Sequence, residues 1–357
     1  MFKTTKIYSL TAILTTAIIY LPLAAQAAPA SPNPYQTRNT NYGVSGGNVN
    51  DITKAFCCSG TLGSLVAAGG VQYILSNNHI LADQDQATVG DNISQPGLVD
   101  TGCQPATTVA HFTTAVPLGN NVDCALAAVV SGLMNSTGSI QGIGTISSVV
   151  TAPAVGLAVE KSGRTTGTTT GTIGSINASV NVQYQLHCGS GKKYILSYTN
   201  QVVINGSSFS AGGDSGSLIV TNSSCHQPVA LLFAGSSTTT VANPIGEVLT
   251  KLHGVLGSSV SFVGGTCTST ALQPSGGQEL QLPQQAIDHA AKVLEQNRHE
   301  LMSKPGVLGV GLGALEDNSQ AAVIVYVDKT SSAKPQLPER LDDVPVRVIL
   351  TDPFIAF

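Results

Sequence analysis

The sequence predicts an all-β main domain, built as a sandwich or a pair of barrels, followed by a small α+β module. Between residues 55 and 245, short runs rich in Val, Ile, Thr, Leu and Tyr recur between clusters of Gly, Asn and Ser. That stretch has no long 3.6-residue periodicity, so it favours many short strands over helices. The composition changes near residue 272, because residues 28 to 272 hold 16 charged residues and all seven cysteines, whereas residues 273 to 357 hold 18 and none. Two differently built units are therefore expected.

The low content of charged residues disfavours several classes of protein. Only 10% of the 357 residues are charged, against about 25% in an average soluble protein. A formal net charge of -4 and a pI near 5.9 provide no basic surface for a phosphate backbone. Disordered polyanions and coiled coils, which need dense charge, are disfavoured as well. We expect no nucleic-acid partner.

The N-terminus, residues 1–27, is typical of a signal peptide. Lys3 and Lys6 precede an apolar run over residues 10–25, and the small-residue pattern Ala25-Gln26-Ala27 closes it. A retained transmembrane helix is the alternative, but threonines and Pro22 interrupt the run. No later segment approaches the length of a membrane span, so we expect a secreted or periplasmic protein without stable membrane association. Residues 28–54, rich in Pro, Asn, Gly and Thr, are expected to form an irregular arm.

Seven cysteines in an exported chain indicate disulfides more than metal ligation. Since the number is odd, one cysteine is left over, and Cys124 is the candidate because it lies in the apolar run of residues 124–130. The pairing of the others stays open. Zinc ligation by His187-Cys188 and Cys225-His226 is the disfavoured alternative, since neither pair has the spacing of structural zinc sites. We expect no metal and no cofactor.

The C-terminal module, residues 283–357, follows a linker at 273–282 that contains Pro, Ser and paired Gly. Ile287, Leu294 and Leu301 recur at heptad spacing. Pro283 before them and Pro305-Gly306 after them mark the two ends of a helix. Strands are predicted at 306–313, 321–328 and 344–350. This module could be a folding chaperone, an inhibitor that occupies the cleft, or a targeting domain, and it could contact the main domain within the chain.

Three residues of the main domain could together perform nucleophilic hydrolysis. Ser215 lies in the turn Gly212-Gly213-Asp214-Ser215-Gly216, where glycines permit a sharp bend. His79 follows an apolar strand, and Asp123 begins another. A serine nucleophile needs an imidazole base, a carboxylate that orients it, and backbone donors for the oxyanion. Taken singly, each feature has an ordinary alternative: a turn, a structural histidine and a capping aspartate. A buried Asp123 would need a partner such as imidazole.

The order His79, Asp123, Ser215, with a Gly-Asp-Ser-Gly turn, resembles the chymotrypsin-like (trypsin-like) serine peptidases. The segment 162–167, Ser-Gly-Arg-Thr-Thr-Gly, and the following Gly171-Thr172-Ile173 resemble the bacterial α-lytic branch of that family. The resemblance implies a double β-barrel peptidase domain over residues 55–272 and serine endopeptidase activity on a polypeptide substrate. It covers the main domain and leaves the C-terminal module unexplained.

The resemblance also implies a role for each site residue. Ser215 would be the nucleophile, His79 the general base and then acid, and Asp123 the group that orients His79. The amides of Gly213 and Ser215 would form the oxyanion hole. Arg164, the arginine of the Ser-Gly-Arg motif, would form a structural ion pair with Asp214. The alternative for Arg164 is a solvated surface charge.

Substrate would bind, by the same resemblance, along the strand that includes Ala234, Gly235 and Ser236. Phe209 falls where trypsins place an acidic residue at the base of the specificity pocket, so a neutral residue is expected before the scissile bond. A core aromatic is the alternative for Phe209. The sequence departs from the family around His79, where Asn77, Asn78 and Ile80 replace the usual Ala-Ala-His-Cys. An inactive peptidase-like binding module and an esterase remain the rival functions.

Overall fold

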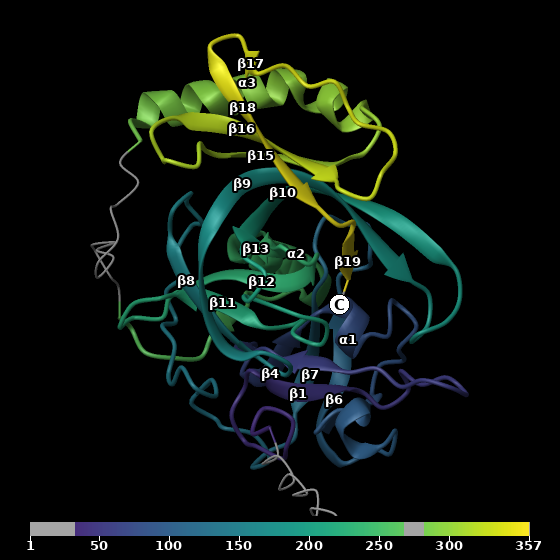
Figure 1. Ribbon diagram of the computed structural model, residues 1–357. Helices are drawn as coiled ribbons and strands as arrows, with labels where there is room; N and C mark the ends of the chain where they lie inside the picture. Colours follow the sequence, from purple (N-terminus) through teal and green to yellow (C-terminus); the bar gives the residue numbers. More distant parts are fainter. Residues whose placement is uncertain (1–32, 268–281, 357) are drawn as a thin grey trace, which may run out of the picture. The chain divides into compact units, whose positions relative to one another are not determined.

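The structure is a computed structural model, and it describes residues 33–267 and 282–356. The fold is predominantly β and consists of two curled sheets, as predicted (Figure 1). The first sheet has the strand order β14-β3-β4-β7-β6-β5-β1-β2. Its strands are β1 (Val44–Asn48), β2 (Gly60–Leu62), β3 (Ser64–Ala68), β4 (Val71–Ser76), β5 (Asn92–Gln95), β6 (Thr107–Ala115), β7 (Ala125–Val129) and β14 (Ser261–Phe262).

The second sheet contains a closed ring of six strands. Their order is β10-β13-β12-β11-β8-β9, and the additional pairing of β9 with β10 closes the ring. These strands are β8 (Ala158–Gly163), β9 (Gly167–Gln185), β10 (Lys193–Asn205), β11 (Leu218–Thr221), β12 (Pro228–Gly235) and β13 (Thr239–Pro244). All their pairings are antiparallel, which agrees with the short, turn-separated apolar runs of the sequence.

Three short helical segments accompany these sheets. The helix α1 (Asn78–Leu81) follows β4 directly, the 3₁₀ helix η1 (Leu98–Thr101) follows β5, and α2 (Ile245–Leu256) follows β13. Gly257 ends α2 with φ 74°, a left-handed conformation that glycine adopts at no steric cost. Among the described residues, no helix has both the length and the apolar character needed to cross a membrane.

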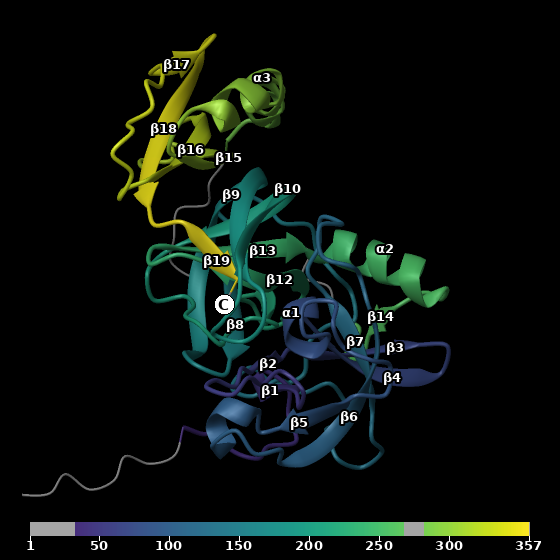
Figure 2. The same cartoon turned by 90° about the vertical axis from the view of Figure 1, so that its right-hand side faces the viewer.

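The C-terminal module has the predicted helix, α3 (Gln284–Ser303), and the three predicted strands, β15 (Val307–Ala314), β16 (Ala321–Asp328) and β18 (Val344–Thr351). It also has two short strands, β17 (Arg340–Leu341) and β19 (Phe354–Ala356). The helix packs on one face of the sheet through Ala290, Val293, Leu294 and Leu301. In Figure 2 the helix and the strands form two layers. The short strand β19 lies apart from them, and the sequence does not predict it.

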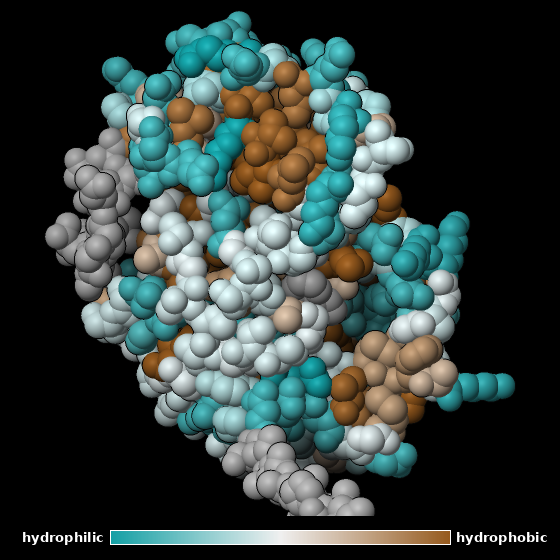
Figure 3. Space-filling view, viewed as in Figure 1, coloured by the Kyte–Doolittle hydropathy of each residue, from teal (hydrophilic) through white to brown (hydrophobic). Residues whose placement is uncertain are grey.

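This module is continuous with the second sheet. β15 pairs antiparallel with β9, through pairs such as Val310 with Ser179. Arg298 of α3 reinforces the join, because its guanidinium donates to the carbonyl of Asn177 and to the hydroxyl of Ser179. Figure 3 shows an apolar patch over the strands of this module. Val348 and Leu350 of β18 are apolar side chains with 46% and 56% of their surface exposed.

The disulfides resolve the pairing that the sequence leaves open. They join Cys57 to Cys103, Cys58 to Cys188, and Cys225 to Cys267. The predicted leftover cysteine, Cys124, is free and buried, and burial raises the pKa of its thiol well above the usual value. Its location in the core makes it a small apolar side chain rather than a reactive thiol.

The expected irregular arm is partly wrong. Residues 44–48 form β1, which pairs with both β2 and β5. Its five residues, Val-Ser-Gly-Gly-Asn, are all buried, so tertiary packing overrides their low strand propensity. The predicted signal peptide lies outside the described residues, and so does nearly all of the predicted linker.

Candidate active site

His79 and Asp123 form the predicted pair. Nδ1 of His79 lies 2.6 Å from Oδ2 of Asp123, and the backbone N–H of His79 donates to Oδ1 at 3.2 Å. His79 comes from α1 at the end of β4, and Asp123 from the residue before the apolar run that forms β7. Because β4 and β7 are neighbours, with Ser76 opposite Ala125, the two side chains are brought together. Both are buried, with 7% and 0% of the side chain exposed.

Asp123 is held by three further polar groups. The hydroxyl of Tyr184 donates to Oδ2 at 2.8 Å, and the backbone N–H of Asp123 donates to the side-chain oxygen of Asn243 at 2.9 Å. The amide of Asn77 donates to the carbonyl of Asp123 at 2.7 Å. These contacts fix the backbone of Asp123, and the carboxylate itself accepts from Tyr184 and from the ring and backbone N–H of His79. The hydrogen bond from Nδ1 of His79 to this fixed carboxylate sets the orientation of the imidazole ring.

Sequence reasoning missed Tyr184 as a site residue. Its ring lies edge-on to His79 at 6.1 Å, and its hydroxyl lies 2.7 Å from that of Tyr198. Burial, and then the charge of Asp123, raises the pKa of Tyr184 well above its usual value, so the phenol stays a neutral donor. Tyr194 stacks on the same ring, opposite it in the β9–β10 pair. The recurrence of tyrosine at positions 184, 194 and 198 was the available signal in the sequence.

Ser215 lies at the seam between the two sheets. Its carbonyl accepts from the N–H of Thr61 in β2 at 2.8 Å. A Cβ at the next residue, Gly216, would come within 2.1 Å of the hydroxyl oxygen of Ser76, at the end of the strand that leads into His79. The turn with Ser215 is thus packed against the residues just before α1. Only glycine fits at position 216, which also has φ 91°.

The Ser215 hydroxyl makes its hydrogen bond to the carbonyl of Phe233, at 3.1 Å. Within the described part of the chain, the structure therefore joins His79 to Asp123 and places Ser215 at the same seam, but it forms no hydrogen bond between Ser215 and His79. A serine hydroxyl reorients by rotation about a single χ1 bond.

The backbone amides of the turn that contains Ser215 differ in their hydrogen bonding. The N–H groups of Asp214 and Gly216 donate to Ala211 and Leu232 respectively. Over the ranges that the structure describes, the N–H groups of Gly213 and Ser215 have no acceptor. Gly213 has φ 95°, a left-handed conformation that turns the chain sharply there. An oxyanion hole formed by these two amides stays a prediction.

The predicted ion pair between Arg164 and Asp214 is wrong, because the cation beside Asp214 is Lys161. Nζ of Lys161 lies 3.3 Å from Oδ2 of Asp214, and both side chains are fully buried. Burial lowers the pKa of Lys161, and the charge of Asp214 opposes that shift. Side chains alternate along β8, and a Cβ at Gly163 would lie 2.5 Å from Oδ1 of Asp214. The face of residues 161 and 163 is therefore the one that meets Asp214.

Arg164 instead forms a two-pronged pair with Asp100 in η1. Its Nε and Nη2 lie 2.7 Å and 2.6 Å from the two carboxylate oxygens. The alternative of a solvated surface charge is also wrong, since the Arg164 side chain is only 13% exposed. The planar guanidinium of Arg164 binds both oxygens of a carboxylate in this bidentate geometry. The compact ammonium of Lys161 is suited to the fully buried position beside Asp214.

Backbone and side-chain donors complete the environment of Asp214. Oδ1 accepts from the N–H groups of Thr165 and Thr166, at 2.8 Å and 3.2 Å. Oδ2 accepts from the hydroxyl of Thr166 at 2.7 Å and from the N–H of Ala211 at 3.0 Å. The residue before Ser215 is thus fixed on both sides, which fixes the turn that presents Ser215 and its amide.

Phe209 lies in the core of the six-stranded ring, with 1% of its surface exposed, among Ile173, Ile204 and Ile219. Of the two alternatives for this residue, its packing is that of a core aromatic. The predicted substrate strand is β12, in which Ala234 and Gly235 are buried. The third predicted residue, Ser236, follows this strand, and its hydroxyl lies 2.5 Å from that of Thr351.

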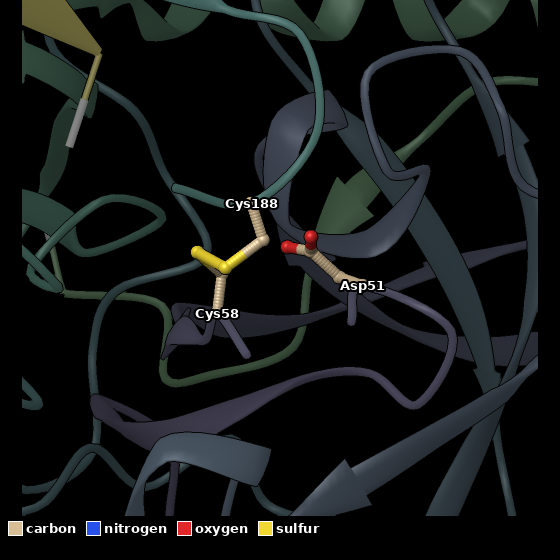
Figure 4. A group of neighbouring side chains, drawn as sticks. All are labelled: Asp51, Cys58 and Cys188. Carbon is tan, nitrogen blue, oxygen red and sulfur yellow. A yellow bond between two sulfur atoms is a disulfide. The ribbon is translucent and has the colours of Figure 1, made fainter. Parts of the chain in front are cut away.

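A second acidic group lies close to His79. The carboxyl of Asp51 points toward the Cys58–Cys188 disulfide (Figure 4). Its oxygen and the two sulfurs lie within 4.8 Å of one another, but both sulfurs belong to the disulfide and are therefore not thiolate ligands. Burial, and then the nearby Asp83, raises the pKa of Asp51 to about 7. Burial likewise raises the pKa of Asp83 to about 6.

No protein-family model matches the sequence, and no curated protein matches it either. Solved structures of bacterial chymotrypsin-like serine proteases are similar to the chain. A glutamic acid specific serine protease is 22% identical, with 61% of this chain and 98% of that one covered and a TM-score of 0.43. Protease A of Thermobifida fusca is 18% identical, with 63% and 99% covered and a TM-score of 0.44. The alpha-lytic protease homolog N4 is 19% identical, with 62% and 98% covered and a TM-score of 0.41.

Proposed function

We propose that this protein is an exported serine endopeptidase that hydrolyses peptide bonds through an acyl-enzyme on Ser215. The observation that carries the proposal is the buried contact of 2.6 Å between Nδ1 of His79 and Oδ2 of Asp123. His79 directly follows β4, and the end of β4 packs against the Ser215 turn. An imidazole held by a buried carboxylate, near a serine in a tight glycine-containing turn, is the arrangement that nucleophilic acyl transfer requires.

The reaction follows from these positions. The Ser215 hydroxyl turns from Phe233 to Nε2 of His79, which takes its proton while the oxygen attacks the substrate carbonyl. The negative charge that develops on the carbonyl oxygen is met by the N–H groups of Gly213 and Ser215. His79 then gives its proton to the leaving amine, and the amine departs. Water, deprotonated by His79, cleaves the acyl-enzyme and restores Ser215.

Asp123 and Tyr184 act on this reaction through His79. The carboxylate of Asp123 fixes the ring and stabilises the imidazolium that forms during proton transfer. Tyr184 donates to the same carboxylate oxygen as His79 does. We therefore assign Tyr184 as a positioning residue, which holds Asp123 in the orientation that His79 needs.

The substrate specificity belongs to the same proposal. A neutral residue before the scissile bond is expected, because Ala234, Gly235 and Ser236 of the predicted substrate strand carry no charge, and cleavage after Lys or Arg should be poor. Export is supported by three disulfides, which persist in oxidising compartments. The basic and apolar N-terminal segment supports the same location.

A small fluorophosphonate probe tests the activity, because it modifies only a serine that a base has activated. The full chain should be labelled at Ser215, as located by mass spectrometry of the modified peptide. Ser215→Ala and His79→Ala should abolish the label, while Ser217→Ala, two residues away, should keep it. Absence of labelling in the folded protein would favour an inactive binding module, and labelling without peptide cleavage would favour an esterase.

A further inference from the structure

The last strand of the chain, β19, is inserted into the second sheet beside the candidate site. It pairs antiparallel with β12, where Ile355 is opposite Gly235 and Ala356 is opposite Ala234. On its other side it pairs parallel with β9, where Phe354 is opposite Val182. Figures 1 and 2 show β19 leaving the layers of the C-terminal module and entering the ring of strands.

β19 covers the edge of β12 that leads to the nucleophile. At Ala234 and Gly235 the first edge of β12 is paired with β13. The second edge of β12 pairs with β11 only as far as Leu231. At Ala234 and Gly235 this second edge pairs with β19 instead. One residue before Ala234 is Phe233, whose carbonyl accepts the hydrogen bond of Ser215. The edge that β19 covers therefore begins next to Ser215.

The direction of β19 is that of a substrate. Because the pairing is antiparallel, the chain from Ile355 to Ala356 runs along β12 from Gly235 to Ala234, toward Phe233 and Ser215. A peptide bound by strand addition to this edge, with its scissile carbonyl at Ser215, would place the residues before that carbonyl where β19 lies. We propose that β19 occupies the substrate strand position, so that the protein blocks its own cleft and hydrolyses peptides only when β19 leaves.

The residues that precede the two paired with β12 anchor this segment by side-chain contacts. Phe354 is fully buried, and its ring lies edge-on to Tyr326 at 5.7 Å. The buried hydroxyl of Thr351 contacts those of Ser236 and Thr238, at 2.5 Å and 2.8 Å. Asp352 pairs with Lys329 at 2.9 Å. These contacts hold the segment at the loop between β12 and β13. This loop lies at the end of the covered β12 edge that is farther from Ser215.

The residues beyond the anchors are held less firmly and indicate the substrate class. Ile355 is 44% exposed, so its place in the edge depends mainly on backbone pairing with Gly235 and Gln183. The edge accepts an aliphatic side chain opposite Gly235 and a small one opposite Ala234. This part of the inference rests on the proposed function: the substrate is an extended peptide with apolar residues before the scissile bond, and it competes with β19 for β12.

The experiment compares the full chain with two variants that open the edge and keep Phe354. One ends after Phe354. The other, Ile355→Pro, keeps the full length, and since Ile355 is paired on both sides, its N–H faces one of the two strands and proline removes that donor. Val348→Ser, on the exposed part of β18, is the matched control. Peptide hydrolysis is measured with an internally quenched apolar peptide, and Ser215 labelling is followed with the fluorophosphonate probe.

Both opened variants should hydrolyse the peptide at least tenfold faster than the full chain and the Val348→Ser control. An added acetylated Phe-Ile-Ala peptide should inhibit the opened variants competitively, and a peptide with these residues in reversed order should inhibit less. Equal rates in the full chain and in both folded variants would overturn the self-blocking and leave the proposed activity standing. Failure of Ser215 labelling in all forms would overturn the proposed activity, and the self-blocking with it.

Discussion

Lys161 and Asp214 form a fully buried ion pair, with Nζ 3.3 Å from Oδ2, directly before the residue proposed as the nucleophile. Lys161 also donates to the carbonyl of Gly167 at 2.9 Å and to the hydroxyl of Thr166. The pair fixes the backbone on both sides of the Asp214 carboxylate. Its position links the stability of the second sheet to the geometry of the Ser215 turn.

Removing the lysine should therefore destabilise the protein strongly. Lys161→Met leaves the Asp214 charge buried without its cation, a change that costs about 3–5 kcal/mol in comparable buried pairs. Arg164→Ala, in the more exposed pair with Asp100, should cost clearly less. Urea unfolding measures both free energies. If Arg164→Ala proved the more damaging of the two, the assignment of Lys161 as the partner of Asp214 would be wrong.

Tyr184→Phe removes the donor to Asp123 while keeping the ring against His79. A hydrogen bond to a charged acceptor contributes about 1.5–3 kcal/mol, so the free energy of unfolding should fall by that order. With one donor fewer, the carboxylate of Asp123 interacts more strongly with the imidazolium of His79. The acid limb of the pH–rate profile should move to higher pH.

Tyr198→Phe is the matched control for this prediction, because the Tyr198 hydroxyl contacts that of Tyr184 and not Asp123. It should leave the acid limb nearly unchanged. An unmoved acid limb in a folded Tyr184→Phe variant would show that Tyr184 is a structural residue with no positioning role.

Asp51 makes the stability of the protein fall as the pH rises. Its folded pKa, about 7, lies above the ordinary value of 3.8 because the carboxyl is buried. Between these values the folded state binds more protons than the unfolded state, so stability present at low pH is lost as the pH rises through 7. Asp51→Asn mimics the neutral carboxyl and should flatten this decline. The melting temperature at pH 4.5, 6 and 8 measures this decline. A variant whose melting temperature falls between pH 4.5 and pH 8 as steeply as that of the natural protein would contradict the account.

Asp123→Asn should lower turnover by about 10⁴ with little change in fold, since the amide cannot hold the required tautomer of His79. The measurement is kcat on a chromogenic peptide, made in the Ile355→Pro background so that β19 does not limit the rate. Asn243→Ala is an informative companion, because it removes the acceptor for the backbone N–H of Asp123 and the amide that donates to Gln201, but no donor to the carboxylate. Its turnover should fall far less. Undiminished turnover in Asp123→Asn would remove Asp123 from the triad.

The sequence was most informative where a local pattern determines the structure. The heptad of Ile287, Leu294 and Leu301 between prolines identified α3, and the apolar run around Cys124 identified the free thiol. The pair of His79 and Asp123 also follows from sequence, because a carboxylate at the start of a buried strand needs a partner.

The features that the sequence did not predict depend on long-range packing. Lys161 pairs with Asp214 because its side chain lies on the face of β8 that meets Asp214. The Ser-Gly-Arg motif around Arg164 does not specify that face. The role of Tyr184 requires the pairing of β9 with β10 across the ring. β19 is three residues long, so its place beside β12 comes from tertiary contacts of Phe354 and Thr351 and not from propensity.

The central claim is that Ser215 forms a covalent acyl intermediate with the help of His79. Mass spectrometry of the Ile355→Pro protein, quenched in acid within milliseconds of mixing with a nitrophenyl ester of an apolar peptide, tests it most directly. We predict one acyl group per protein, located on the peptide that contains Ser215 and absent in the Ser215→Ala and His79→Ala variants. Hydrolysis of the ester with no acyl group on Ser215, or an acyl group that persists in His79→Ala, would contradict the account.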